Sequence, residues 1–369
     1  MKILLIEDEA DFVNRLKNHA ATLEGVELLV PADVKLATSF GSKNDMPLEE
    51  QLALHLKQIV TEYAIDLILL DTDLSQNCEF RSQTEYRQAL AEIGIPTLRY
   101  RKRPHRGKEG IVDFVRKLAK DGASAIMVPH YLVIGVSPET TLFPWLIEIH
   151  AGFNAIHQAM KAHPEYVKVG AGQKASDGPA GLLARILERS ELHSDLLGYT
   201  APNAYFFAEP SLAIESVDAA VYALATRLGY WLVNYILAFP GPLLPPPAAA
   251  AVLNISTASF ERDDIQKIVQ IARYTGPFSK LNQGFYWRQD LSELVMDAGG
   301  DVAELLPKGA PALERVDPNP YGQAFYCLVT GAPIAAADVA ISPDWIPPGA
   351  SMTRISQDEL DTLGPMLNI

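Results

Sequence analysis

Cysteine is scarce in this chain: only Cys78 and Cys327 occur among its 369 residues. The two lie far apart in the sequence and form no pair with the spacing of metal ligands. The sequence therefore predicts no framework of disulfides, and its cysteine content fits a reducing cytoplasm. A chain of 369 residues can form about two or three domains with a large core.

Positive charge is also in short supply, because 31 Lys and Arg residues face 45 Asp and Glu residues, for a net charge of −14. This balance argues against non-specific binding to nucleic acid or to an anionic membrane surface. Long hydrophobic runs are missing as well: Asn234 and Pro240 interrupt the apolar stretch 228–244, which predicts a buried helix followed by a loop. The first apolar run is too short for a signal peptide. We therefore expect a cytoplasmic protein without a membrane partner.

Two apolar segments that end in acidic residues stand out against this background. Residues 67–70 lead directly to Asp71, and residues 2–6 lead to the Glu-Asp-Glu sequence of residues 7–9. Segments that are apolar on both faces are typical of parallel strands covered by helices on both sides. Ligands gather beyond the carboxyl ends of such strands, so three or four carboxylates are expected at one edge. Since like charges repel unless a cation joins them, the sequence predicts a site for a hard metal ion.

These segments resemble the receiver domain of two-component response regulators, a CheY-like domain. In that family the first strand ends in an acidic pair, matched here by Glu7 and Asp8, and the third strand ends in the phosphoacceptor aspartate, matched by Asp71. The resemblance covers roughly the first third of the chain. It implies a Mg²⁺ ion bound by Glu7, Asp8, Asp71 and the backbone carbonyl of Asp73. It also implies phosphorylation of Asp71, with a histidine kinase or another signalling protein as partner.

The residues that would complete a phosphorylation switch differ from the family pattern. The family ends its fourth strand with Ser or Thr, where our alignment places Arg101. It ends its fifth strand with lysine followed by proline, where this chain has Pro129 followed by His130. The half of the site that binds metal is thus kept, and the half that senses the phosphoryl group is lost. An atypical receiver or a pseudo-receiver fits these residues at least as well as a working phosphoswitch.

A dense basic segment, residues 99–108, follows the predicted fourth strand in this acidic chain. One interpretation is an anion or partner site, in which Arg101 or Lys102 supplies the charge of the missing lysine and contacts the phosphoryl group. The other is a solvated run of charge that balances the acidic edge, as is common on protein surfaces.

Hydrophobic periodicity predicts strands that alternate with helices in the first part of the chain. The predicted strands are residues 2–6, 26–30, 67–70, 95–100 and 123–128, and the predicted helices are residues 10–23, 48–63, 84–93 and 109–121. Right-handed crossovers between them give a doubly wound five-stranded parallel sheet, the flavodoxin-like arrangement of receivers. The predicted fold class is therefore α/β, followed by a mostly helical α+β second domain.

The predicted domains follow from composition and from the end of the strand–helix alternation. A receiver-like domain is expected over residues 1–140, a connecting helix over 141–165 and an uncharacterised output domain over 166–369, with a further division near 240–255 as an option. Residues 131–136 are predicted to form another strand-like segment. Residues 240–250, which are rich in proline and alanine, are predicted to form a stiff, extended connector.

Two features of the later sequence have both a functional and a structural interpretation. His150 and His157 lie seven residues apart on a predicted helix and share a face. Without a carboxylate at metal-ligand spacing, they are interpreted as packing or interface residues. Aromatic and basic residues alternate in segments 273–280 and 285–288, which is one way to build a stacking surface for nucleic acid or peptide. A transition from core to surface fits an acidic chain better.

The main hypothesis is a signalling protein in which phosphorylation of Asp71 with Mg²⁺, or partner binding at that edge, controls a C-terminal output domain. The alternative is an enzyme with its active site in residues 166–369 and the receiver-like domain as regulator or dimerisation surface. That alternative requires a polar pocket with convergent titratable residues in the second half. A homodimer is a further option, and nucleic acid is not an expected partner.

Overall fold

The computed structural model describes most of the chain, and the chain divides into two compact units. The described residues are 1–36, 47–74, 83–102, 118, 122–134, 137–163, 178–199, 217–340 and 342–367. The first unit comprises Met1–His105, Leu118–Ala175 and Tyr205–Trp231, and the second comprises Arg106–Lys117, Ser176–Ala204 and Leu232–Ile369.

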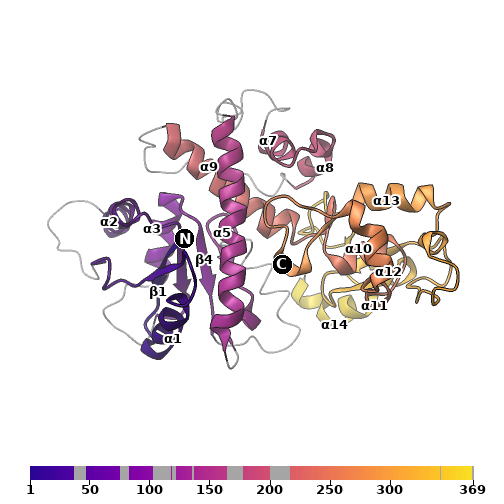
Figure 1. The fold of residues 1–369 in the computed structure, drawn as a ribbon, viewed down its shortest axis with the longest axis horizontal. Helices are drawn as coiled ribbons and strands as arrows, with labels where there is room; N and C mark the ends of the chain where they lie inside the picture. Colours follow the sequence, from indigo (N-terminus) through magenta and orange to yellow (C-terminus); the bar gives the residue numbers. More distant parts are fainter. Residues whose placement is uncertain are drawn as a thin grey trace. The chain divides into compact units, whose positions relative to one another are not determined.

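The first unit is built on a five-stranded parallel sheet (Figure 1). Its strands are β1 (Lys2–Ile6), β2 (Glu27–Leu29), β3 (Leu67–Asp71), β4 (Thr97–Tyr100) and β5 (Ile126–Met127). Their order is β2-β1-β3-β4-β5, and the neighbouring strands are parallel. The helices of this unit are α1 (Ala10–Ala20), α2 (Leu48–Tyr63), α3 (Gln83–Ile93), η1 (His130–Leu132), α5 (Pro138–Ala162) and α9 (Val217–Trp231). The predicted five-stranded parallel sheet is confirmed.

Helices cover both faces of this sheet because its central strands are apolar on both sides. One face packs on α2 and α3 in a core that includes Ile6, Ile68 and Leu90. The other face is covered by α1 and α5 (Figure 1), which contact one another. Between these two helices the rings of His19 and Phe143 lie 5.5 Å apart, measured between centroids. The sheet is therefore wound on both sides, with its carboxyl ends free to carry polar groups.

A helix from far along the sequence, α9, completes the first unit. It packs on α5, where the rings of Phe153 and Tyr230 meet edge to face with their centroids 5.5 Å apart. The hydroxyl of Tyr230 accepts a hydrogen bond from the N–H of Thr97 at 2.7 Å and donates to the carbonyl of Ile95 at 3.0 Å. Helix α9 is thereby attached to the beginning of β4.

Within the described residues, the second unit has more helix than strand and contains two small sheets. Strands β6 (Leu243–Leu244) and β7 (Tyr286–Trp287) pair antiparallel, and β8 (Ala324–Cys327) lies between β9 (Ala332–Ala335) and β10 (Thr353–Arg354). Its helical segments are α7 (Pro179–Ile186), η3 (Ser190–Leu192), α8 (His193–Leu197), η5 (Leu232–Ile236), α10 (Pro246–Val252), α11 (Thr257–Phe260), α12 (Asp263–Val269), η6 (Gln270–Ala272), η7 (Leu281–Gln283), α13 (Arg288–Asp297), η8 (Val302–Leu305), η9 (Ala336–Asp338) and α14 (Gln357–Leu367). The predicted α+β character of this half is confirmed.

Residues 240–250 are a buried part of the second unit, so the predicted extended connector is wrong. Strand β6 lies within this segment, and α10 begins at Pro246 with Pro245 as its N-cap. Proline is tolerated in the first turn of a helix because the N–H that it lacks would have no partner there. The alanines of residues 248–251 are at most 1% exposed, and those of residues 248–250 pack in the core around α10.

The end of the first sheet also differs from the prediction. Residues 130–132 form a 3₁₀ turn, η1, where the strand 131–136 was expected, and Tyr131 is 65% exposed. Strand β5 is shorter than predicted. The helix predicted over residues 109–121 lies outside the described residues, apart from Leu118.

The apolar stretch 228–244 forms the end of α9, the π-helical segment η5 and then β6. Within the described ranges, the helices lack the combination of length and apolar character that crossing a membrane requires.

Candidate functional site

Three acidic side chains converge where β1 and β3 end. Ile6 of β1 and Leu70 of β3 are partners in the parallel ladder, so Glu7 and Asp71 follow them side by side. One carboxylate oxygen from each of Glu7, Asp8 and Asp71 lies within 4.8 Å of the others. Glu7 and Asp71 are buried, and Asp8 is partly buried. The structure thus places the predicted acidic residues together, and we call these three side chains the acidic cluster.

Backbone N–H groups in the turns after the two strands hold these carboxylates. The N–H of Glu9 donates to Oε1 of Glu7 at 2.8 Å, and the N–H of Asp73 donates to Oδ1 of Asp71 at 3.0 Å. Both bonds join residues two positions apart, and the one to Asp71 is a local preference of aspartate at turns. The backbone of Asp73, predicted to join a metal shell through its carbonyl, therefore runs beside the cluster.

Lys102 places its ammonium group among the acidic side chains. Its Nζ lies 2.8 Å from Oε1 of Glu7, 2.8 Å from Oε2 of Glu9 and 3.1 Å from Oδ2 of Asp71. The Lys102 side chain is 21% exposed, whereas the side chains of Glu7 and Asp71 are 0% exposed. One positive charge is thus shared by three carboxylates, two of which have no access to solvent.

The sequence interpretation missed Tyr100, which closes the cluster from β4. Tyr100 is the ladder partner of Asp71 and is fully buried, and its hydroxyl donates to Oε2 of Glu7. Its ring packs on Phe12, with 5.7 Å between the centroids. A tyrosine that ends an apolar strand is the one signal that could have found it, because a buried hydroxyl requires a partner. Tyr100 therefore supplies a hydroxyl at the end of β4, where the comparison with the receiver family had placed Arg101.

The other residues predicted for the switch half of the site contribute differently. Arg101 follows β4 and its side chain is exposed. Pro129 brings no charge to the end of β5 and serves as the N-cap of η1, which begins at His130. Residues 103–108 of the basic segment lie outside the described residues. In the described part of the chain, Lys102, whose ammonium group lies in the cluster, follows β4. The corresponding lysine of the receiver family is expected at the end of β5.

Burial and mutual repulsion control the protonation of the cluster. Burial and the neighbouring charge of Glu7 raise the pKa of Asp71 to about 7, although the N–H of Asp73 and the charge of Lys102 favour its ionised form. Burial alone would lower the pKa of Lys102, but its hydrogen bonds to Glu7 and Glu9 raise it above the usual value. Lys102 therefore stays charged, and Asp71 exchanges a proton near neutral pH.

The donor atoms of the cluster suit a small divalent cation. Mg²⁺ prefers oxygen ligands in an octahedral shell at about 2.0–2.1 Å, which places ligand atoms about 3–4 Å apart. The oxygens of Glu7, Asp8 and Asp71 already lie within 4.8 Å of one another, so a small inward movement brings them to that spacing. The three groups are carboxylates, without imidazole or thiolate, and such a set favours a hard ion.

A cavity of about 170 Å³ with a mixed polar and apolar lining lies at the amino ends of the strands in the same unit. It is lined by Asp66 and Pro96, which precede β3 and β4, and by residues of α5 and α9 that include His150, Asn154 and His157. Nε2 of His150 lies 3.8 Å from Oδ2 of Asp66. The two histidines are about 10 Å apart along the helix axis, so they line one cavity without meeting at one atom.

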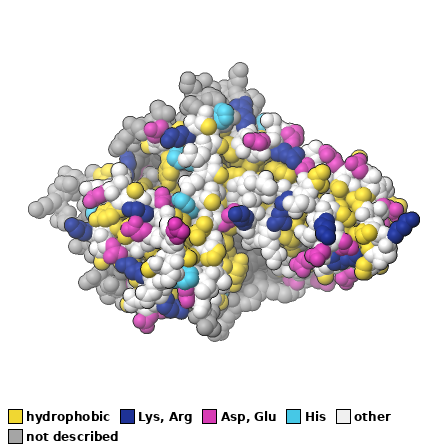
Figure 2. Space-filling view, viewed as in Figure 1, with side chains coloured by type: hydrophobic (Ala, Val, Ile, Leu, Met, Phe, Trp, Pro, Cys, Tyr) yellow, Lys and Arg dark blue, Asp and Glu magenta, His cyan; other side chains and the backbone are white. Residues whose placement is uncertain are grey.

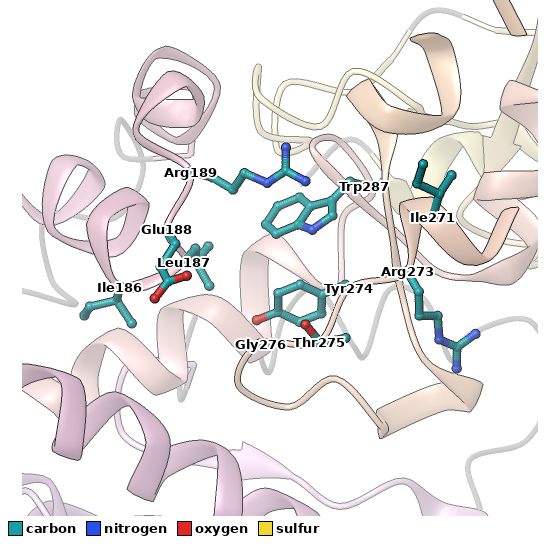
Figure 3. A pocket seen from close by; sticks show the side chains of 10 residues that line it. All are labelled: Ile186, Leu187, Glu188, Arg189, Ile271, Arg273, Tyr274, Thr275, Gly276 and Trp287. Carbon is teal, nitrogen blue, oxygen red and sulfur yellow. The ribbon is translucent and has the colours of Figure 1, made fainter. Parts of the chain in front are cut away.

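The second unit contains a polar cavity of about 440 Å³ (Figure 3). The rings of Tyr274 and Trp287 form one wall and meet edge to face, with their centroids 5.1 Å apart. The guanidinium of Arg189 lies 4.9 Å from the Trp287 ring and donates to both carboxylate oxygens of Asp290, at 3.1 and 2.6 Å. Glu188 extends its carboxylate toward the open space (Figure 3). Among the described residues, the lining includes the charged side chains of Glu188 and Arg189, which can bind a polar ligand.

The aromatic rings of segments 273–280 and 285–288 belong to the core of the second unit. The following five are at most 7% exposed: Tyr274, Phe278, Phe285, Tyr286 and Trp287. Figure 2 shows basic and acidic side chains interspersed on the visible face, with no broad basic patch. These rings are therefore not available as a platform on which bases could stack.

Comparisons with known proteins identify no relative. No model of a protein family, no curated protein and no solved structure matches this chain. The flavodoxin-like arrangement of the first unit follows from its sheet order and helices, and a function must be inferred from the geometry of its residues.

Proposed function

We propose that the first unit is an atypical receiver domain that binds Mg²⁺ at Glu7, Asp8 and Asp71, accepts a phosphoryl group on Asp71, and thereby controls the second unit. The observation that best supports this proposal is the convergence of the acidic ends of β1 and β3 in a sheet of order β2-β1-β3-β4-β5. A histidine kinase or another cytoplasmic signalling protein is the proposed partner.

Asp71 is the proposed nucleophile. One of its carboxylate oxygens attacks the phosphorus of a phosphoryl donor, and the bond between phosphorus and the leaving oxygen breaks as the new bond forms. Lys102 follows β4 and can pair with the transferred anionic oxygens, in place of the lysine that this chain lacks at Pro129. A bound Mg²⁺ neutralises carboxylate and phosphoryl oxygens.

The remaining residues of the site position the carboxylates. The hydroxyl of Tyr100 and the N–H of Glu9 fix the two oxygens of Glu7. The N–H of Asp73 fixes one oxygen of Asp71 and leaves the other toward Lys102. Because these donors are already in place, the Glu7 and Asp71 carboxylates themselves require little reorganisation to receive a cation or a phosphoryl group.

Acetyl phosphate and Mg²⁺ provide a direct test. Intact-mass spectrometry of the wild type is expected to show one added phosphoryl group, which hydroxylamine removes because acyl phosphates are labile to it. The Asp71→Asn variant is expected to show none. Asp11→Asn is the matched control, since it removes one carboxylate from an exposed position of α1 and is expected to keep the adduct.

The adduct measurement is combined with the unfolding temperature of the wild type with and without Mg²⁺. Together they separate the phosphorylated receiver from a pseudo-receiver that acts through partner binding. A wild type that forms no adduct but shows a Mg²⁺-dependent rise in its unfolding temperature retains the metal site and loses the phosphoacceptor role. A wild type with neither an adduct nor a response to Mg²⁺ contradicts the proposal for this cluster.

A further inference from the structure

Lys102 already occupies the place of a cation in the acidic cluster. Its Nζ contacts Oε1 of Glu7 at 2.8 Å and Oδ2 of Asp71 at 3.1 Å, and both residues belong to the set that suits a divalent ion. The ring of Phe12 lies below the ammonium, with its centroid 5.3 Å from Nζ. The lysine is therefore held by two buried carboxylates and by an aromatic face.

The two cations cannot share this position. An ion such as Mg²⁺ lies about 2.1 Å from its oxygen ligands, whereas the ammonium lies about 3 Å from oxygens of the same residues. Both would then be only a few ångströms apart. Repulsion between a single and a double positive charge at that distance is strong where little solvent screens it.

Lys102 has a way out of the cluster. Its third partner, Glu9, is 37% exposed and lies toward solvent, and its contact with Nζ is 2.8 Å. The four-carbon stem of lysine is flexible, and the side chain is 21% exposed. The ammonium can therefore leave Glu7 and Asp71 while it stays near Glu9.

We infer that Lys102 and a divalent cation are alternative occupants of the acidic cluster, so that the ion enters only as the Lys102 ammonium leaves Glu7 and Asp71. The inference rests on the proposed metal site and adds its regulation. Without the ion, Lys102 neutralises part of the negative charge of the cluster. With the ion, the released ammonium is available for the anionic oxygens of a phosphoryl group or partner.

Titration with Mg²⁺ alone, followed by isothermal calorimetry, tests the competition. Lys102→Met keeps the apolar stem over Phe12 and removes the charge. It is expected to bind Mg²⁺ roughly tenfold more tightly than the wild type or better, because the ion no longer displaces an ion-paired ammonium. Lys17→Met is the matched control, since Lys17 pairs with Asp33 at 2.6 Å and has no contact with the cluster; its affinity is expected to equal that of the wild type.

Lysine labelling of the wild type tests the displacement without any substitution. Acetic anhydride at limiting concentration, followed by peptide mass spectrometry, measures the reactivity of each lysine with and without saturating Mg²⁺. Labelling of Lys102 is expected to increase at least several-fold with Mg²⁺, while labelling of Lys17 stays constant. This measurement decides the question even if Lys102→Met fails to fold.

The outcomes distinguish the inference from the proposed function. If the wild type binds Mg²⁺, the labelling of Lys102 does not change and Lys102→Met has the wild-type affinity, the competition is overturned while the metal site stands. If neither the wild type nor a folded Lys102→Met binds Mg²⁺, the metal site itself fails and the inference fails with it.

Discussion

The two ends of the first sheet hold their polar groups in opposite ways. At the carboxyl end, Glu7 and Asp71 have side chains that are 0% exposed, and Lys102 lies against both. At the amino end, Asp66 is 42% exposed and faces His150 across a cavity of about 170 Å³. Buried charges require a fixed counter-charge, whereas a carboxylate that reaches solvent is stabilised by the solvent itself. The carboxyl end is therefore the end where a change of one charge has the larger effect.

Removal of the counter-charge is expected to have the largest effect. Without added metal, Lys102→Met leaves buried carboxylates with no cation, and the free energy of unfolding is expected to fall by about 2–4 kcal/mol. Urea denaturation at pH 8 measures this change. Lys17→Met, which breaks a half-exposed ion pair, is expected to lose less than about 1 kcal/mol. Equal losses in the two variants would contradict the larger effect expected for a change of charge at the carboxyl end of the sheet.

Removal of a carboxylate from the same end is expected to act in the opposite direction. Asp71→Asn eliminates a buried negative charge beside Glu7, and above pH 7 it is expected to raise the free energy of unfolding by about 1–3 kcal/mol. The gain is reduced because the ion pair with Lys102 is lost as well. Urea denaturation at several pH values compares the variant with the wild type.

The sign of this pH dependence follows from the raised pKa of Asp71, about 7 when folded against 3.8 for the free group. Between these pH values the folded chain holds a proton that the unfolded chain has lost. The contribution of Asp71 to stability therefore falls as the pH rises from about 4 to 7, and the penalty is complete above pH 7. The stability gained by Asp71→Asn should decrease as the pH is lowered through 7. A gain that does not vary with pH would contradict this account.

Loss of the Tyr100 hydroxyl is expected to have an intermediate effect. Tyr100→Phe keeps the ring against Phe12 and removes the donor to Oε2 of Glu7. Hydrogen bonds to charged groups contribute about 1–2 kcal/mol, so urea denaturation should show a loss of that size. Tyr63→Phe, in which the ring lies at the end of α2, is the matched control and should change stability by less.

The amino end is expected to give the smallest effect. Burial lowers the pKa of both His150 and His157, so the unfolded chain takes up protons first as the pH falls below about 6.5. The free energy of unfolding should therefore decrease on acidification, by less than about 1 kcal/mol. Replacement of both histidines by Gln should abolish this decrease. Thermal unfolding between pH 7.5 and roughly 5.5 measures it.

The groups that face these histidines limit the size of the effect. Asp66 favours the charged form of His150, and the N-terminal ammonium opposes it. Lys161 disfavours the charged form of His157, and Asp218 favours it. His163→Gln, at an exposed position after α5, is the control for the substitution itself.

The acidic cluster could be predicted from sequence because it depends on local patterns. The apolar segments that became β1 and β3 end directly in Glu7, Asp8 and Asp71, and parallel pairing brings such ends together. The choice between Arg101 and Lys102 could not be made, because it depends on register. Asp71 pairs with Tyr100, the last residue of β4, and the chain bends at Lys102 directly after this strand. Lys102 therefore turns toward the cluster.

The second unit shows where local composition misleads. A run of prolines followed by alanines has the same sequence pattern in an exposed linker and at the beginning of a buried helix. Only the surrounding residues decide, and here Phe260 and Leu291 pack with the alanines of α10 in one core. The cavity beside Trp287 was likewise hidden, since it is formed by the turn after α7 and by segments about 100 residues further along.

The contacts of Glu7 with Tyr100 and Lys102 pass over β3, which lies between β1 and β4. Tyr100 and Lys102 lie 93 and 95 residues after Glu7, so their contacts with it close a long loop, and we expect these contacts to form late in folding. Contacts made after the transition state affect the unfolding rate more than the folding rate. We therefore expect the contacts of Glu7 with Tyr100 and Lys102 to slow the unfolding of the sheet and so to lengthen the lifetime of its folded state.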